Sequence, residues 1–413
     1  MRSGFFVSAA CSRLAGMTQL LYYQDPEQLN FSAAVTRVDG QRVALSATAF
    51  YPEGGGQNAD VGRLSWSGGE AQVTDTQKNK ASGELWHTLS GAVPGVGDEV
   101  QGEVDAAHRW RTMQRHSGEH LLAQAFFRLN PAFAVAAVGM RSAECTLDLQ
   151  GQPAETDVRA AETLLRETLG RRRLKLRTVE VPEAELERYP LRRSTKITGT
   201  VRLVIFEDEH GFFDVSACGG VHVPWAAMAG PVTVLRTERI KGGLTRVVFM
   251  AGEEAGERLS SSYQAGRTLA ATFSAGPDDL TARVEALRRT AQDQALQLAE
   301  AQRVLLTNEI AAAPAEPFGD VRLRQLDVKD AALLPTALSV TPPGEVLLVT
   351  APGGRVGIGS TFSVHAGEVL RSALGVAGGK GGGKPEAAQG QTPDVDGFAA
   401  AVRAALSERQ VSA

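Results

Sequence analysis

Residues 116–120 read His116-Ser117-Gly118-Glu119-His120, and about a hundred residues later the chain reads Cys218-Gly219-Gly220-Val221-His222. The first cluster opens a helix-like stretch, in which side chains four residues apart project from the same face. Cysteine and histidine together are ligands that zinc takes in proteins. The chain has only seven histidines and three cysteines. Two matched clusters of these scarce residues therefore predict one shared metal site, formed by His116, His120, Cys218 and His222.

The composition is that of a folded protein rather than a disordered or membrane-spanning one. Hydrophobic residues make up 43% and charged residues 22% of 413 positions, which is ordinary for globular domains, and the length predicts two to four of them. No stretch approaches the ~18 consecutive apolar residues of a membrane span. The net charge of −4 argues against a uniformly basic nucleic-acid binder. Three cysteines provide no disulfide framework, so we expect a cytoplasmic protein with no membrane partner.

Residues 1–16 differ from the rest of the chain. They are basic, lack acidic residues and are rich in small residues. Their apolar run is too short for a secretory signal. We expect a poorly ordered N-terminal extension, with an organelle-targeting leader as the alternative.

Residues 17–110 alternate short strand-like segments with turn residues. Apolar and polar residues alternate at 32–38, 42–50, 70–75 and 84–89, with glycine-containing turns between them. Several short strands without helices must close on themselves or cover their edges. The region therefore predicts a small antiparallel β-barrel, or a curled sheet, as the first domain.

A glycine-rich loop lies within this region and reads Phe50-Tyr51-Pro52-Glu53-Gly54-Gly55-Gly56-Gln57. Consecutive glycines let the backbone approach a ligand closely and present its N–H groups. The loop is not a nucleotide phosphate loop, because no Lys-Ser/Thr pair follows it. Two interpretations stay open for Gly54, Gly55, Gly56 and Gln57: a plain turn, or contact with a substrate.

Residues 111–255 mix helix and strand patterns and predict an α+β domain around the metal site. A first helix is expected from about 110 to 129 and a second over 156–169, with strands at 171–181, 201–206, 232–235 and 246–249. Basic residues gather at 171–177 and 192–196, either as a solvated face or as a surface for a phosphate backbone. The apolar face of the first helix consists of Leu121, Leu122, Ala125, Phe126 and Leu129.

Residues 256–312 predict a helical arm. Apolar residues follow heptad spacing through three heptads, from Val284 to Leu305, with the polar Gln294 at one seam position. This pattern is typical of a coiled coil or a helical hairpin. We expect an arm that supports dimerisation or acts as a spacer, followed by a linker at 311–317.

Residues 313–413 predict a small α/β domain with an unusual lysine–glycine segment. Strands are expected at 344–350 and 355–359, and helices at 366–374 and 393–407. Glycine amides and lysines suit a loop that contacts phosphate or ribose, and a flexible linker is the alternative. The candidate contacts are Lys380, Gly381, Gly382, Gly383 and Lys384.

Four motifs, in this order and spacing, resemble one known family. The loop at 50–57 with Asp60-Val61-Gly62, the segment 116–122 and the segment 218–223 are similar to the editing module of alanyl-tRNA synthetases. The segment 378–390 resembles the C-terminal domain of the same enzymes and of DHH-type phosphoesterases. Because barely twenty residues precede the first expected strand, the chain looks like the free-standing, long form of alanyl-tRNA editing proteins, the AlaX type.

The resemblance implies a hydrolase that deacylates mischarged tRNA(Ala) in trans, chiefly Ser-tRNA(Ala), with Gly-tRNA(Ala) as a second substrate. It implies an editing fold related to that of threonyl-tRNA synthetase and one zinc ion per chain on the four donors. The arm would support a homodimer, and residues 380–384 would contact tRNA. The residues expected at the aminoacyl end are Gly54, Gly55, Gly56, Gln57 and Arg246.

The role of the zinc stays open. Hydrolysis of an aminoacyl ester needs an activated water and a stabilised oxyanion, and zinc can help with both. Four protein ligands, however, make a closed site of the structural kind. Either one ligand is displaced, or the ion holds the substrate's amino group while its neighbours position water. We expect the zinc to orient the aminoacyl end, and Gln57, as a catalytic residue, to position the ester or the water together with the backbone amides of residues 54–56. Glu119 stands where the synthetases more often carry threonine, so we expect the discrimination between amino acids to differ here. Glu119 is also a candidate general base.

Two other functions fit parts of the sequence. His116, Glu119 and His120 also satisfy H-x-x-E-H, the signature of zinc peptidases in which glutamate activates water. Those peptidases take a glutamate as third ligand, which the second cluster does not supply. A non-catalytic, zinc-stabilised module would bind tRNA without turnover.

Overall fold

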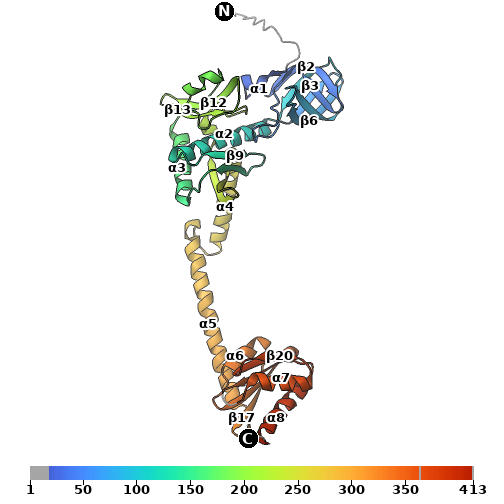
Figure 1. Cartoon of the computed structure of the whole chain (residues 1–413), viewed down its shortest axis with the longest axis vertical. Coiled ribbons are helices and arrows are strands. Elements are labelled where there is room, and N and C mark those ends of the chain that lie inside the picture. Colours follow the sequence, from blue (N-terminus) through green and yellow to red (C-terminus); the bar gives the residue numbers. More distant parts are fainter. Residues whose placement is uncertain (1–17, 362–363, 412–413) are drawn as a thin grey trace, which may run out of the picture. The chain divides into compact units, whose positions relative to one another are not determined.

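The computed structural model describes residues 18–361 and 364–411. The chain divides into two compact units, the first ending at Gly266 and the second beginning at Arg267 (Figure 1). The N-terminal extension expected at 1–16 lies outside the described residues. Within them, every helix is too short or too polar to cross a membrane.

The first unit begins with a closed antiparallel barrel of strand order β2-β3-β7-β6-β5-β8, which confirms the predicted barrel. β5 and β8 are not expected from the sequence, because glycine interrupts the alternating pattern of each. Gly102 is required where it stands, since a Cβ there would lie 2.3 Å from the Phe31 ring inside the barrel. The barrel strands are β2 (Asn30–Asp39), β3 (Arg42–Leu45), β5 (Gly62–Trp66), β6 (Gly69–Lys78), β7 (Leu85–Gly91) and β8 (Glu99–Val104).

Two short elements flank the barrel. The segment expected as one strand at 42–50 splits into β3 and β4 (Ala47–Thr48), and β4 pairs in parallel with β1 (Gln19–Leu20). Helix α1 (Leu21–Gln24) follows β1 directly. It places Tyr22 and Tyr23 beside Tyr51 of the glycine loop, with ring centroids of Tyr22 and Tyr51 5.4 Å apart.

One histidine is buried inside the barrel in its neutral form. Nδ1 of His87 donates to the carbonyl oxygen of Val43 at 3.2 Å, which leaves Nε2 to accept from Thr48 Oγ1 at 2.8 Å. Burial lowers the pKa of His87 to about 4, from about 6.5 in an unfolded chain.

This burial predicts an acid-sensitive barrel. Below pH 6.5 the unfolded chain binds a proton that the folded barrel excludes, so the free energy of unfolding should fall by roughly 3 kcal/mol as the pH drops toward 4. Thermal melts of the parent chain and of His87→Gln between pH 7 and pH 4.5 test this. The variant should lose less stability on acidification than the parent, and equal pH slopes would contradict the prediction.

Helix α2 (Ala106–Leu129) leaves the barrel directly after β8 and forms the centre of the α+β part (Figure 1). Asp105 caps it by accepting a hydrogen bond from the His108 backbone N–H at 2.9 Å. The helix therefore begins one turn earlier than expected. Leu129 of the predicted apolar face is 42% exposed at the last turn. The other predicted core residues are fully buried: Leu121, Leu122, Ala125 and Phe126.

Two antiparallel sheets contact α2, in the orders β14-β15-β10-β9 and β11-β12-β13. Helix α3 (Glu155–Arg171) packs on α2 and confirms the second expected helix. The strand expected from 171 begins later, because α3 continues to Arg171. The remaining bounds are β9 (Val135–Gly139), β10 (Cys145–Leu149), β11 (Lys175–Pro182), β12 (Thr200–Asp208), β13 (Gly211–Ala217), β14 (Val232–Ile240), β15 (Leu244–Ala251) and α4 (Gly252–Ala271).

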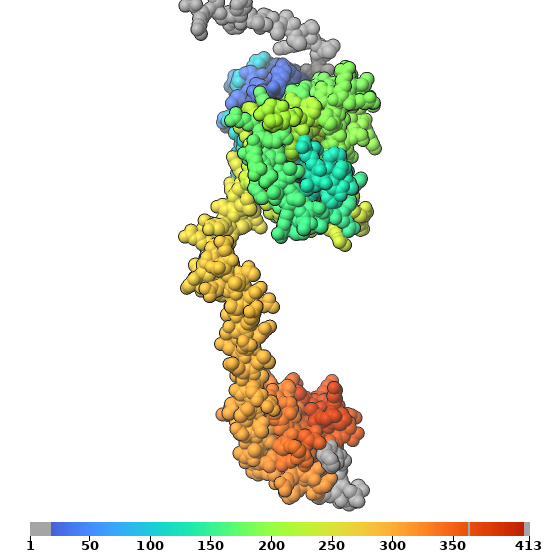
Figure 2. Space-filling view, turned by 90° about the vertical axis from the view of Figure 1, so that its left-hand side faces the viewer, coloured from blue at the N-terminus to red at the C-terminus, as the bar shows by residue number. Residues whose placement is uncertain are grey.

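The longest helix of the second unit within the described residues is α5 (Leu280–Ala312), which confirms the predicted long helix. Its last turns, with Leu306 and Ile310, pack into the core of the same unit. Most of the apolar seam is exposed, including Leu298 at 60% and Leu305 at 62%. Figure 2 shows α5 as a slender orange stalk that meets the body of its unit at one end.

The body of the second unit is a six-stranded mixed sheet of order β16-β17-β18-β19-β21-β20. The lysine–glycine segment, expected as a loop, forms a hairpin of β20 (Lys380–Gly383) and β21 (Ala387–Gln391). Glycine permits this pairing under α7, since a Cβ on Gly381 would lie 2.8 Å from Leu374. The expected linker at 311–317 is occupied by the end of α5 and by β16. The other elements are β16 (Ala315–Phe318), β17 (Val321–Asp327), α6 (Leu334–Ser339), β18 (Glu345–Ala351), β19 (Arg355–Ser360), α7 (Ala366–Ala377) and α8 (Val395–Val411).

Candidate metal centre

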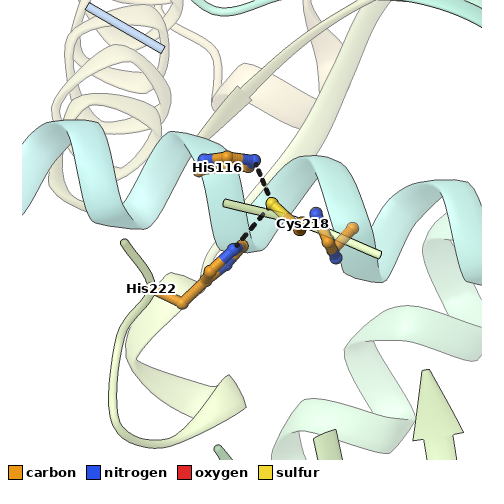
Figure 3. A group of neighbouring side chains, drawn as sticks. His116, Cys218 and His222 are labelled. Atoms are coloured by element: carbon orange, nitrogen blue, oxygen red, sulfur yellow. Dashed lines mark hydrogen bonds between the residues drawn. The ribbon is translucent and has the colours of Figure 1, made fainter. Parts of the chain in front are cut away.

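The structure brings the four predicted metal donors together. His116 and His120 lie one turn apart on α2. Cys218 and His222 lie on the loop that follows β13, with Cys218 between His116 and His222 (Figure 3). The donor atoms are all within 4.8 Å of one another. Cys218 Sγ is 3.3 Å from His116 Nε2 and 3.5 Å from His222 Nε2. Zinc bonds of ~2.0–2.3 Å at tetrahedral angles place donors roughly 3.3–3.8 Å apart, so this set fits one tetrahedral ion.

Each imidazole of the cluster is held through its other ring nitrogen. An acceptor at Nδ1 fixes the tautomer and leaves Nε2 free to bind a metal, which is the usual arrangement of metal-binding histidines. One of these acceptors, Ser117, lies inside the first sequence cluster. Another, Asp214, is marked by no sequence pattern, and only its contact with His120 in the structure identifies it. The Nδ1 contacts are His116 to Gln57 Oε1 at 2.7 Å, His120 to Asp214 Oδ2 at 3.0 Å, and His222 to Ser117 Oγ at 3.2 Å.

The electrostatics of the cluster favour a thiolate. Burial alone would raise the pKa of the Cys218 thiol, but the fields of His116 and His120 hold it well below its usual value. Burial likewise opposes protonation of His120, yet Cys218 and Asp214 raise the pKa of His120 to about 10. Burial, with the field of His116, lowers the pKa of His222 to about 3. A thiolate and a neutral imidazole are the forms that bind metal ions, so an ion that binds His120 must displace its proton.

Gln57 lies behind His116 rather than at an open surface. It is 1% exposed, and its Oε1 accepts from both His116 Nδ1 and the Val221 backbone N–H, the latter at 3.3 Å. A Cβ on Gly220 would lie 2.1 Å from His116 Cε1 and 3.0 Å from this oxygen. Glycine at 220 therefore lets the second cluster close over the imidazole that Gln57 orients.

This placement predicts a metal defect for Gln57→Ala. Loss of a partner that orients a metal ligand typically lowers metal affinity by about 10–100-fold, and we expect this decrease here. Competition with a zinc-binding dye measures the affinity. If zinc affinity is unchanged and hydrolytic activity is lost, Gln57 contacts the substrate instead. If both zinc affinity and activity are unchanged, Gln57 neither orients His116 for the metal nor contacts the substrate.

Arg202, which the sequence analysis does not single out, holds the loop of the second cluster. Its Nη1 donates to the carbonyl oxygens of Cys218 at 2.8 Å and Gly220 at 3.0 Å. Its guanidinium lies 4.5 Å from the ring centroid of Tyr23. In the sequence Arg202 is one polar position in a buried strand, and no pattern there marks it.

We expect Arg202→Met to lower zinc affinity by about 10–100-fold, because two carbonyl groups of the loop lose their donor. Arg177→Met is the matched control, since Arg177 lies on the neighbouring strand β11 and pairs with Glu207. Dye competition and the cobalt-substituted absorption spectrum report on the site directly. Equal affinities in the two variants would show that Arg202 does not position the loop.

The donor cluster opens into a cleft of about 760 Å³. Glu119 lies in its lining, is 4% exposed, and its Oε1 has no hydrogen-bond partner in the part of the chain that the structure describes. Gly56 and Gln57 are outside the lining. Cations reach the cleft from two sides: Lys78 from the barrel, and Arg192, Arg193 and Lys196 from the segment before β12. The predicted site residues in the lining are Gly54, Gly55, His116, Glu119, His120 and Cys218.

The other candidate residues lie elsewhere. Arg246 on β15 forms a bidentate ion pair with Asp148 of β10, at 2.8 and 3.0 Å, and does not line the cleft. Lys380, Gly381, Gly382, Gly383 and Lys384 belong to the second unit and are exposed on the hairpin.

Comparison with known proteins identifies relatives of both units. Family models match at residues 10–108 (class II tRNA synthetases, A), at 201–248 (threonyl and alanyl tRNA synthetase second additional domain) and at 328–409 (DHHA1 domain). The alanine–tRNA ligase of Archaeoglobus fulgidus is 33% identical over 387 residues, covering 90% of this chain and 42% of that protein. The alanine–tRNA ligase of Pyrobaculum calidifontis is 32% identical over 403 residues, covering 94% and 44%.

The chain thus spans about two-fifths of the length of these curated relatives. A solved structure, the C-Ala domain of Aquifex aeolicus alanyl-tRNA synthetase, matches 22% of this chain and 95% of that domain at 27% identity, with a TM-score of 0.20. The second-additional-domain match covers β12 to β15, and so includes Cys218 and His222. The three family models and the ligase relatives together show that this chain is similar to alanyl-tRNA synthetases over about 90% of its length.

Proposed function

We propose that the protein is a zinc-dependent hydrolase that removes wrongly attached serine or glycine from tRNA(Ala). The observation that supports this most directly is the cleft, which combines a Cys–His donor set, a buried carboxylate oxygen without a hydrogen-bond partner among the described residues, and a basic rim. The ligase relatives and the second-additional-domain match support tRNA(Ala) as the partner. The reaction is a hydrolysis in the cytoplasm that requires no ATP.

Each group of residues in the cleft has a separate role in hydrolysis of the aminoacyl ester. Bound zinc supplies Lewis-acid polarisation of an ester carbonyl or a lowered pKa of water. His116, His120, Cys218 and His222 would hold the ion. The glycines at 54 and 55 leave room for the aminoacyl end. Glu119 accepts a hydrogen bond and then a proton from the attacking water, since a buried acceptor without a partner requires one.

A four-way assay tests the proposal. The full-length protein is incubated with labelled Ser-tRNA(Ala), Gly-tRNA(Ala), Ala-tRNA(Ala) and a peptide pool, with chelator and after zinc is restored. We expect zinc-dependent release of serine and glycine, with alanine retained. Peptide cleavage would show a peptidase of the H-x-x-E-H type instead. Binding of tRNA without release would show a non-catalytic module.

The second unit supplies two further parts of the proposal. The exposed seam of α5 pairs with the same helix of a second copy, because heptad apolar residues are stable when covered by a partner helix. The exposed lysines Lys380 and Lys384 contact the tRNA backbone. Sedimentation of the full chain distinguishes dimer from monomer, and a monomer would contradict the first of these assignments.

A further inference from the structure

The basic rim of the cleft is not neutralised by the protein. Its lining holds two carboxylates, Glu53 and Glu119, against four cations. Glu53 is already paired, with Arg141 at 2.5 Å. Of the four cations only Arg192 forms an ion pair. Lys78, Arg193 and Lys196 have no ion-pair or hydrogen-bond partner among the residues that the structure describes.

Elsewhere in the first unit many arginines are paired with carboxylates. Such pairs occur on the barrel, on α2 and on both sheets. The excess of cations over carboxylates in this cleft, beside the donor cluster, favours an anionic ligand there. Examples of the paired arginines are Arg37, Arg63, Arg109, Arg115, Arg172, Arg177, Arg236 and Arg246.

Two of the free cations stand on a loop that is anchored to the metal centre. Residues 190–199 form no regular structure. Within this loop the Arg192 side chain is 9% exposed and donates to Asp214 Oδ1 at 3.1 Å and Ser216 Oγ at 3.2 Å. Asp214 is the residue that orients His120. The buried Arg192 thus sets the position of the loop, and the exposed Arg193 and Lys196 remain available to a ligand.

We propose that Arg193 and Lys196, with Lys78 from the barrel side, bind the phosphodiester groups of a single RNA strand whose 3′ end enters the cleft. The inference rests on the proposed function: with an aminoacyl ester at the donor cluster, the preceding phosphates of the same strand lie at the rim. The cleft of about 760 Å³ accommodates a group the size of one small ligand rather than a duplex. Cations on flexible stems then hold the backbone without reading its sequence.

The double variant Arg193→Met/Lys196→Met tests this in two assays on the full chain. In the first, binding of a fluorescent single-stranded RNA ending in a 3′ adenosine is measured by anisotropy against salt. Each phosphate contact on a single strand contributes about 0.7 to the slope of log K against log salt, so the slope should decrease by about 1.4 in the variant. This assay requires no hydrolysis and so remains informative if the proposed function fails.

In the second assay, the KM for Ser-tRNA(Ala) should rise about tenfold or more while kcat is retained. Hydrolysis of 3′-O-seryl-adenosine, which has no phosphate, should be unchanged in the variant. The control Lys241→Met/Arg258→Met removes the same charges from exposed positions outside the cleft, and it should behave as the parent. An unchanged salt slope, equal effects of the two double variants, or tighter binding of an acidic peptide than of RNA would overturn the inference.

Discussion

Replacement of Cys218 by alanine is expected to remove the bound zinc and to reduce deacylation of Ser-tRNA(Ala) by about a thousandfold. Cys218 supplies the anion among four donors, and its Sγ lies within 3.3–3.5 Å of two imidazole nitrogens. Without the thiolate, only three neutral imidazoles remain as donors. No negative charge in the donor set then offsets the charge of the divalent cation. Zinc content by mass spectrometry and single-turnover deacylation measure the two effects.

Cys145→Ala is the matched control for this variant. Cys145 is buried in the core on β10, and among the described residues its Sγ hydrogen-bonds only to the backbone carbonyl oxygens of Ser142 and Ala143. Burial raises the pKa of its thiol to about 12, so it stays protonated and binds no metal. The control should keep both zinc and activity. A Cys218→Ala protein with full zinc occupancy would show that the donor set is wrong, and one that is active without zinc would show that the ion is not needed for the reaction.

Asp60→Ala should lower the free energy of unfolding by about 3–5 kcal/mol, the cost of leaving one member of a buried ion pair alone. Asp60 is fully buried, and its carboxylate accepts from Arg109 Nε at 3.0 and 3.1 Å and from the Tyr51 backbone N–H at 2.6 Å. Arg109 lies on α2 and is 1% exposed. The pair therefore ties the glycine loop, which Tyr51 and Asp60 flank, to the helix that carries His116 and His120.

Denaturant titration of the parent and the variant measures this loss. Glu103→Ala, which breaks the exposed pair with Arg63 on the barrel surface, is the control and should cost less than about 1 kcal/mol. The double variant Asp60→Leu/Arg109→Met should be more stable than Asp60→Ala, because it leaves no unpaired buried charge. If Asp60→Ala is no less stable than Glu103→Ala, the buried pair does not hold loop and helix together.

The regular elements of this protein were largely predictable because their signals are local. Alternation of apolar residues predicted the barrel, and heptad spacing predicted α5. The prediction missed β5 and β8 of the barrel and also β10 and β17, which contain no glycine. It took the lysine–glycine segment for a loop, whereas this segment forms strands β20 and β21. Glycine is needed at Gly102 because the Phe31 ring lies where a Cβ would be. That steric reason involves residues distant in sequence, so no local pattern contains it.

The sequence by itself identified the four candidate metal donors, because His116 and His120 lie one helical turn apart and scarce residue types recur in a second cluster. Only the tertiary structure decided what surrounds them. It places Gln57 behind His116, connects Asp214 to both His120 and Arg192, and sets Arg202 under the loop of Cys218. These contacts join residues that are 16 to 94 positions apart in the sequence. Helical spacing is a property of neighbouring residues, whereas such contacts depend on strand register and on how the barrel and the two sheets pack around α2.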